Sequence, residues 1–244
     1  MTQGETVNCS ITSLTTVPLI HLTDVRLLYL FENNITFFER DSFASLTELE
    51  LLIVLLCGLR TIELGAFNGL TKLTYLSISM NYICDIPCTF ENMTNLEYLD
   101  LSYNRIEHVE SAVFSRLVNL KYIGLQGNSL QYLHPDTFLG LPNIQQLYFS
   151  NNLRLQIPNG RNFIKSHSLS RLDVSRYNIS SLSVETFANV SALNSLDLSY
   201  NNLSTVDINI LTALPKLSAL YLHSIRYSMT VSCRKCGDGV RIIT

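Results

Sequence analysis

One motif of 11 residues recurs along the chain at nearly constant intervals, and this regularity constrains the fold more than any other feature. In the copy at residues 96–106, leucine or isoleucine fills the first, fourth, sixth and eleventh places, and Asn104 fills the ninth. The first places are separated by 24, 24, 23, 24, 24, 25, 24 and 24 residues, and they are Val25, Leu49, Leu73, Leu96, Leu120, Ile144, Leu169, Leu193 and Leu217. Such a period predicts stacked copies of one unit, each of which buries its apolar side chains against its neighbours.

Each copy reads as a short strand followed by a turn. Leu99 and Leu101 alternate with polar or aromatic residues, which is the period of a strand that is buried on one face only. The amide of Asn104 offers two donors and a carbonyl acceptor, so it can satisfy main-chain groups that the turn leaves unpaired. We therefore interpret Asn104 as a structural fastener. The ninth places along the chain are Asn33, Cys57, Asn81, Asn104, Asn128, Asn152, Tyr177, Asn201 and Ile225.

A second column of the repeat is aromatic. A phenylalanine follows the motif in seven copies, namely Phe43, Phe67, Phe90, Phe114, Phe138, Phe163 and Phe187. The leucines, the asparagine and the phenylalanine together resemble the leucine-rich repeat. The repeat length is similar to that of extracellular members such as Toll-like receptors, Slit, variable lymphocyte receptors and small leucine-rich proteoglycans. The resemblance implies an α/β fold, a right-handed solenoid or horseshoe with a parallel sheet on its concave face and short helical or irregular turns behind.

The domain limits follow from where the repeat begins and ends. We expect about nine repeats over residues 25–227. Residues 1–24 resemble the end of a cysteine-rich amino-terminal cap, and we expect a partial cap because no cysteine precedes Cys9. Residues 228–244 are expected to be a degenerate or truncated carboxy-terminal end, because few residues follow the last cysteine. Covered ends matter because an open solenoid end exposes its core.

The sixth repeat departs furthest from the pattern. Arg154 stands where an apolar residue belongs, and we interpret Leu155 and Ile157 as shifted. We expect a bulge or a longer loop between Asn151 and Ser168.

The charge and hydropathy of the sequence exclude several classes of function. The formal charge is −3, the isoelectric point is about 5.9, and lysine and arginine do not cluster. These values argue against an electrostatic nucleic-acid binder and against docking on an anionic membrane. The apolar run at residues 49–59 contains Glu50 and is much shorter than the roughly 20 residues that span a bilayer. Residues 1–8 lack the features of a signal peptide, so we expect either a lost leader or a protein that stays inside the cell.

Catalytic and metal-binding patterns are missing from the sequence. The five histidines occupy different repeat positions, without a nucleophile at matching spacing or a glycine-rich phosphate loop: His21, His108, His134, His167 and His223. The pair Cys233 and Cys236 forms a CxxC, but zinc would need two further ligands at matching spacing. We therefore expect a protein that is not an enzyme and that carries neither a metal nor a cofactor.

The remaining cysteines divide by position. Cys57 occupies an asparagine place, so we expect a buried thiol that behaves as a small apolar group. Cys84 and Cys88 share one loop and are candidates for a local disulfide in an oxidising compartment. Cys233 and Cys236 are expected to pair near the terminus.

Six Asn-X-Ser/Thr sequons indicate a secretory route. They begin at Asn8, Asn34, Asn92, Asn178, Asn189 and Asn202. Asn34, Asn178 and Asn202 directly follow the ninth place of a repeat, where side chains should point to solvent. We expect a glycoprotein located outside the cell or on its surface.

The outward places of the strands form the candidate binding face. The third, fifth, seventh and eighth places should make four columns, apolar over the early repeats and charged over the late ones. The candidate ligand-binding residues are Tyr29, Phe31, Ile53, Leu55, Tyr75, Tyr98, Asp100, Tyr122, Tyr148, Arg171, Asp173 and Asp197. Adjacent tyrosines are suitable anchors for a protein partner. The alternative is that they only cover the sheet, while the apolar strands contact a cap or another subunit.

These expectations converge on a protein-recognition module. The resemblance to Toll-like receptors implies the ectodomain, or a fragment of one, of a cell-surface or secreted receptor of the adhesion or innate-immunity type. It would bind a protein ligand or a second copy of itself, with no nucleic-acid partner and no membrane insertion by this chain. The alternatives are a secreted matrix glycoprotein of the proteoglycan sort and an intracellular inhibitor-type scaffold.

Overall fold

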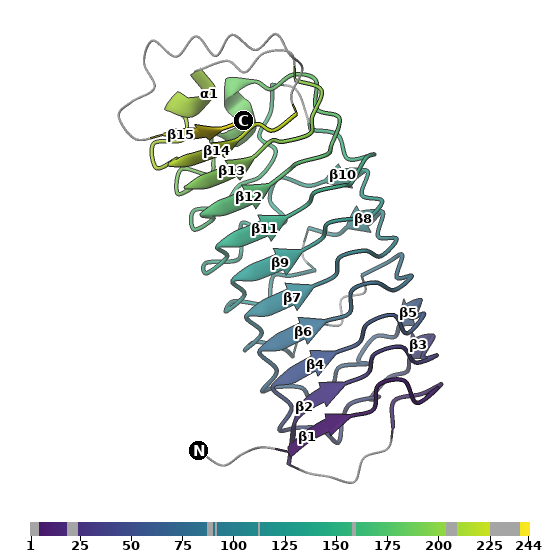
Figure 1. Cartoon of the computed structure of the whole chain (residues 1–244). Helices are drawn as coiled ribbons and strands as arrows, with labels where there is room; N and C mark the ends of the chain where they lie inside the picture. The colour runs from purple at the N-terminus through teal and green to yellow at the C-terminus, as the bar shows by residue number, and fades with distance from the viewer. Residues whose placement is uncertain are drawn as a thin grey trace.

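The computed structural model describes residues 5–18, 24–86, 90, 92–111, 113–157, 160–203, 209–224 and 240–244. An 11-stranded parallel sheet runs along the molecule, in the order β1-β2-β4-β6-β7-β9-β11-β12-β13-β14-β15 (Figure 1). Nine strands coincide with the predicted copies: β2 (Val25–Tyr29), β4 (Leu51–Ile53), β6 (Tyr75–Ser77), β7 (Tyr98–Asp100), β9 (Tyr122–Gly124), β11 (Gln146–Tyr148), β12 (Arg171–Asp173), β13 (Ser195–Asp197) and β14 (Ala219–Tyr221). The predicted solenoid with a parallel sheet is confirmed.

Equivalent places of neighbouring repeats pair with each other. Tyr98 pairs with Tyr122, and Leu99 pairs with Ile123. Each column of the sequence repeat therefore becomes a column of side chains across the sheet. Because adjacent strands are about 4.8 Å apart, equal side chains in one column come close to contact.

Both ends of the sheet carry a strand that the repeat did not predict. β1 (Glu5–Asn8) pairs with β2, and β15 (Arg241–Ile243) pairs with β14. Segments that we expected to be a partial cap and a degenerate end therefore extend the sheet. Cys233 and Cys236 lie outside the described residues, and the predicted limits of the end segments stay predictions.

The core consists of the leucine places and the phenylalanine column. The seven phenylalanines are each at most 1% exposed. Successive rings from Phe43 to Phe138 lie 5.7 to 6.3 Å apart and nearly parallel. Beside the irregular sixth repeat, Phe149 contacts both Phe138 and Phe163, at 5.7 and 6.3 Å. Each buried ring stabilises the fold by about 1.5–3 kcal/mol relative to exposure, so this column is a main element of the core.

The chain after each turn forms a flank with little regular structure. Two short parallel pairs occur there, β3 (Phe37–Phe38) with β5 (Thr61–Ile62), and β8 (His108–Val109) with β10 (Tyr132–Leu133). A 3-10 turn, η1 (Val184–Phe187), and a short helix, α1 (Asn209–Thr212), belong to the return segments. This agrees with the predicted short helical turns behind the sheet.

The ninth-place asparagines fasten one repeat to the preceding one. Asn81 donates from Nδ2 to the Val54 carbonyl at 2.9 Å and to the Ile78 carbonyl at 3.1 Å. Its Oδ1 accepts from the main-chain N–H groups of Cys57 and Leu59, at 3.0 and 3.1 Å. The amide is therefore fully used and buried. The predicted fastener is confirmed, and its bonds reach beyond its own turn to the neighbouring repeat.

The same pattern recurs along the solenoid. Four further asparagines donate to a carbonyl of the preceding repeat at 2.9 to 3.0 Å: Asn104, Asn128, Asn152 and Asn201. At Cys57 a thiol takes over the donor role, because its Sγ donates to the Leu30 carbonyl at 2.6 Å. Cys57 is 1% exposed, and burial raises the pKa of its thiol. The predicted buried thiol is confirmed.

Candidate functional site

A row of four tyrosines crosses the middle of the exposed sheet face, and we call it the tyrosine row. Tyr75, Tyr98 and Tyr122 occupy the third place of their repeats and are the first residues of β6, β7 and β9. Their rings stack at 4.2 Å and 5°, and at 4.0 Å and 7°. Tyr148, at the fifth place of the sixth repeat and the end of β11, continues the row at 5.2 Å and 33°. In-register pairing of the strands is the physical cause of this stacking.

The stacking determines what a partner can reach. Inner ring faces cover one another, so ring edges and hydroxyl groups are presented to solvent. Burial raises the pKa of Tyr75, Tyr98 and Tyr122, and the Asp100 carboxylate adds to the effect. The hydroxyls therefore stay protonated at neutral pH and can donate hydrogen bonds. The row is a rigid, half-buried surface of amphipathic groups.

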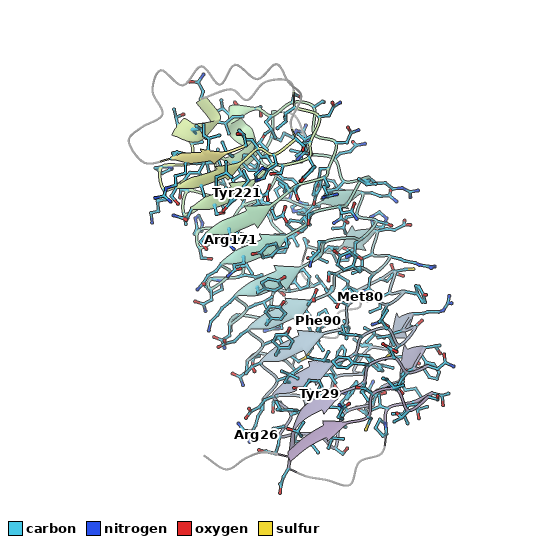
Figure 2. The ribbon with its side chains drawn as sticks, in the orientation of Figure 1. Arg26, Tyr29, Met80, Phe90, Arg171 and Tyr221 are labelled. Carbon is cyan, nitrogen blue, oxygen red and sulfur yellow. The ribbon has the colours of Figure 1, made fainter. Side chains whose placement is uncertain are left out.

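The early strands present apolar side chains next to the row. Ile53 and Leu55 are half-buried, while Leu56, Met80 and Tyr103 are 52%, 47% and 51% exposed. Tyr29 and Phe31 contact each other edge to face at 5.8 Å on the first repeat. Figure 2 labels Tyr29 near this end of the sheet and Arg171 and Tyr221 near the other. The predicted apolar early half is present, with its most exposed residues at the eighth place.

The eighth place has a backbone feature that the sequence did not reveal. Every repeat has a left-handed residue here, with φ between 49° and 68°: Glu32, Leu56, Met80, Tyr103, Gly127, Asn151, Arg176, Tyr200 and Ser224. Side chains other than glycine and asparagine rarely adopt such values. The eighth-place side chains are exposed except at Gly127. They form a projecting edge along the sheet face.

The predicted exposure of the seventh place is wrong in four repeats. Ser79, Ser102, Ser175 and Ser199 are only 2% to 8% exposed. In three repeats the fifth-place aspartate accepts the seventh-place N–H with its Oδ1, at 2.8 to 3.0 Å, in the pairs Asp100 with Ser102, Asp173 with Ser175, and Asp197 with Ser199. The small serine lies beneath this contact and does not reach the surface.

The late strands form a small hollow with two carboxylates. A cavity of about 140 Å³ is lined by Tyr148, Arg171, Leu172, Asp173, Ser195, Asp197 and Tyr221. Because Asp173 and Asp197 lie in one column on adjacent strands, the sequence also predicts that Arg171 and Arg176 compensate their charges. This prediction is wrong, because no ion pair joins these arginines to the aspartates among the described residues.

Both arginines have other contacts. Arg171 donates from its guanidinium to the Tyr148 hydroxyl at 3.4 Å, and this bond raises the pKa of Arg171. Arg176 lies 4.4 Å from the centre of the Tyr200 ring. Asp173 and Asp197 both line the hollow.

The predicted modification sites lie at the surface. The sequon asparagines are exposed at Asn8, Asn34, Asn92, Asn178 and Asn189, and Asn202 is half-buried. Cys84 is exposed with a free thiol, while Cys88 lies outside the described residues. Glycan attachment and the Cys84–Cys88 disulfide therefore stay predictions.

The described part of the chain lacks two further features, a metal-binding cluster and a membrane span. No group of three or more His, Cys, Asp or Glu side chains is placed there to hold a metal ion. No helix among these residues has the length and apolar character needed to cross a bilayer.

The repeats match a known family model. The model described as leucine rich repeat matches residues 56–106, 94–153, 119–176 and 167–224. No curated protein sequence matches the chain. Among solved structures, a chain of the octameric complex of Latrophilin 3, Unc5D and FLRT2, in which FLRT2 is the LRR component, is similar with a TM-score of 0.73 and 25% identity.

Two other solved structures share the fold. The TLR13–ssRNA13 complex and the leucine-rich repeat domain of APL1B each give a TM-score of 0.68 at 23% identity. The three alignments cover 87%, 86% and 88% of this chain. They cover 65%, 34% and 66% of the other chains, so this chain spans at most about two thirds of each.

Proposed function

The chain belongs to the leucine-rich repeat family, and from this premise we propose that it is a non-enzymatic recognition module that binds a protein on its sheet face. The observation that carries the proposal is the tyrosine row, which crosses four strands with stacking distances of 4.0 to 5.2 Å. Tyrosines held in place lose little side-chain freedom on binding, and such rings dominate protein interfaces.

The size of the face supports a protein-sized ligand. Nine strands about 4.8 Å apart extend over roughly 40 Å, which suits an interface of standard dimensions. The row lies between the apolar early strands and the aspartate-lined hollow of the late strands. An apolar centre with a charged margin is the usual organisation of such interfaces.

A protein partner is favoured over single-stranded RNA. FLRT2 occurs in a complex with Latrophilin 3 and Unc5D, and TLR13 in a complex with ssRNA. Binding of unpaired bases usually needs free aromatic faces and a positive groove. In this chain the inner tyrosine faces are taken by one another, and the formal charge is −3.

We infer further that the chain is the ectodomain, or part of it, of a cell-surface or secreted receptor of the adhesion or innate-immunity type. Five exposed sequon asparagines support a secretory route. The alternatives are a secreted matrix glycoprotein and an intracellular scaffold. Glycan occupancy after secretion from animal cells, measured by the mass removed with a glycosidase, separates the intracellular alternative from the other two.

The binding proposal is tested with an array of purified extracellular domains. The probe is the whole chain, coupled into a tetramer so that weak binding can be detected. We expect at least one domain to bind, and Tyr98→Ala to weaken that binding by about 1 to 4 kcal/mol, the range for interface aromatics. The control is Tyr82→Ala, since Tyr82 is also exposed, at 43%, but lies outside the row. Binding that survives Tyr98→Ala, or an array with no binding domain, would contradict the proposal.

A further inference from the structure

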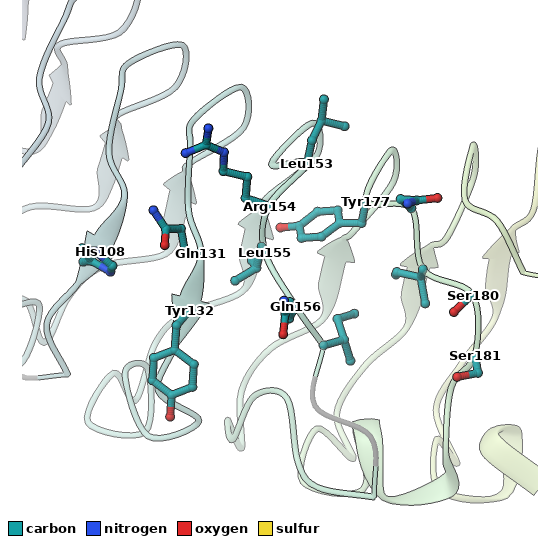
Figure 3. A pocket seen from close by; sticks show the side chains of 13 residues that line it. His108, Gln131, Tyr132, Leu153, Arg154, Leu155, Gln156, Tyr177, Ser180 and Ser181 are labelled. Carbon is teal, nitrogen blue, oxygen red and sulfur yellow. The ribbon is translucent and has the colours of Figure 1, made fainter.

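A second concave site lies on the flank, away from the sheet face, and we call it the flank groove. It has a volume of about 870 Å³ and lies where the sixth and seventh repeats meet. Its lining residues come from the fourth to seventh repeats, and they include Tyr132, Arg154, Gln156, Tyr177 and Ser181 (Figure 3).

At the groove, the main-chain hydrogen bonding between the flank segments of neighbouring repeats is interrupted. It joins the fourth, fifth and sixth repeats, since Gln131 N–H donates to the Glu107 carbonyl at 3.1 Å and Gln156 N–H donates to the Gln131 carbonyl at 3.4 Å, whereas among the described residues no equivalent bond joins the third repeat to the second or to the fourth. Among the described residues, no main-chain hydrogen bond joins 153–157 to 178–182. The sheet side stays paired at the same junction, where Gln146 pairs with Arg171. The two repeats therefore separate only on the flank.

Two sequence features cause the interruption. The sixth repeat contains one extra residue, and Leu155 N–H donates to the Asn152 carbonyl within a local turn at 3.0 Å. The ninth place of the seventh repeat is Tyr177 in place of an asparagine. At the preceding junction the Asn152 Oδ1 accepts the Leu130 N–H at 3.1 Å, and a tyrosine has no amide with which to make this link.

Tyr177 also places a buried polar group beneath the groove. Its side chain extends toward Leu155 of the sixth repeat (Figure 3). Tyr177 is 3% exposed, and its buried hydroxyl makes no well-formed hydrogen bond among the described residues, although the Asn152 side chain is close enough to lower its pKa. Tyr177 therefore shapes the wall of the groove with its ring and offers a ligand no accessible hydroxyl.

The lining favours a particular chemistry. In a regular ladder, Ser180 and Ser181 would donate their N–H groups to the Gln156 carbonyl, and here neither bond is present. The groove thus has an acceptor on one wall and donors on the other, which an extended main chain can satisfy together. Arg154 is exposed and makes no ion pair among the described residues, and the lining contains no carboxylate.

We propose that the flank groove binds an extended peptide segment of a protein partner, with an acidic side chain of that segment beside Arg154. The peptide adds the missing main-chain rung between the sixth and seventh repeats. Leu153 and Tyr132 at the rim, 69% and 57% exposed, supply apolar contacts. This site is separate from the sheet face and does not depend on the function proposed for it.

The free chain gives the first test, by amide hydrogen exchange. Ser180 and Ser181 should exchange rapidly, because their N–H groups lack acceptors, whereas Gln131 at the equivalent place of the fifth repeat should be protected. If the two serines exchange as slowly as Gln131, the chain itself fills the groove and the proposal is overturned. The sample is treated with a glycosidase beforehand, because Asn178 also lines the groove.

Binding is tested with a phage-displayed library of short random peptides selected on the whole chain. Selected sequences should be rich in aspartate and glutamate, and as labelled peptides they should slow exchange at Ser180 and Ser181. Arg154→Glu should weaken them about tenfold or more, as expected for loss of one good contact. The matched control is Arg105→Glu, an exposed flank arginine outside the groove, which should leave affinity unchanged.

The outcomes separate the two proposed sites. Peptides that are insensitive to Arg154→Glu, or a selection that yields no binding peptide, would overturn the flank groove. Peptides that lose affinity in Tyr98→Ala instead bind the sheet face, and they would support the sheet-face function while overturning this one.

Discussion

At the scale of single residues, the ninth-place asparagine is the most informative side chain of the repeat. Its amide makes bonds that no other side chain of that size can make together, so its role could be predicted from chemistry alone. Replacing Asn104 by alanine removes the donors to the Ile78 and Leu101 carbonyls, at 3.0 and 3.1 Å, and the acceptor of the Ile83 N–H. These buried groups are then unpaired.

We expect Asn104→Ala to lower the free energy of unfolding by about 1 to 3 kcal/mol, measured by urea titration. The control is Asn95→Ala. Asn95 makes one exposed bond to the Thr71 carbonyl, so its loss should lower the free energy of unfolding by a few tenths of a kcal/mol at most. Equal effects for the two variants would contradict the fastener role, because burial would then make no difference.

Tyr177 occupies the ninth place of the seventh repeat, where it has no amide with which to link neighbouring repeats. Burial raises its pKa well above the ordinary value, and the Asp173 charge adds to the shift. The folded chain therefore binds this proton more tightly than the unfolded chain. This difference in proton binding stabilises the folded chain. The contribution to the free energy of unfolding is complete below the ordinary tyrosine pKa of about 10 and is lost as the pH rises above that value.

Tyr177→Phe should therefore leave the free energy of unfolding at pH 7 unchanged or slightly higher, because the hydroxyl it removes makes no well-formed hydrogen bond. It should also reduce the loss of stability between pH 7 and about pH 11. Urea titrations of both proteins at the two pH values measure this. A clear loss of stability at pH 7 would mean that the hydroxyl has a partner in solution.

At the scale of elements, the strand positions could be predicted but the turn geometry could not. Leucine spacing determines which face of each strand is buried, and all nine predicted strands occur at their expected places. The left-handed eighth place was missed, since it holds residues such as Leu56, Met80 and Tyr103 that do not favour positive φ. The regular stacking of neighbouring repeats imposes this conformation against local preference.

Gly127 is the one glycine among these eighth-place residues. A Cβ added there would lie 2.6 Å from Tyr103 Cδ1, and its φ is +68°. We expect Gly127→Ala to destabilise the fold by about 1 kcal/mol or more. Gly140→Ala is the control, because nothing lies within 4 Å of an added Cβ there. If both changes have the same effect in thermal unfolding, neither the strain nor the contact at Gly127 is significant.

Side-chain partners were the least predictable part of the candidate site. Opposite charges in neighbouring columns suggested that Arg171 and Arg176 pair with Asp173 and Asp197, but each arginine instead contacts a tyrosine. Sequence columns give the strand and the face, whereas partner choice depends on rotamers. The flank groove had a readable signal, since Tyr177 breaks the asparagine column beside the longest spacing in the repeat series.

At the scale of the whole molecule, the apolar early half of the sheet face has two possible occupants, a different protein or a second copy of this chain. Leu56, Met80 and Tyr103 project from consecutive repeats and are each about half exposed. Exposed apolar patches of this kind on soluble proteins usually mark an interaction site. Self-association would bury them against the same surface of a second chain by two-fold symmetry.

Leu56→Glu decides between these occupants by sedimentation equilibrium. If the patch is a subunit contact, the wild type is a dimer and this change splits it into folded monomers, because a buried glutamate would lack a partner. The control is Leu153→Glu, an equally drastic change at a leucine that is 69% exposed on the flank. A heterologous partner predicts instead a monomeric wild type, whose binding to that partner is weakened by Leu56→Glu and by Tyr98→Ala, but not by Leu153→Glu. A dimer that resists Leu56→Glu would place the subunit contact elsewhere and leave the sheet face free for a ligand.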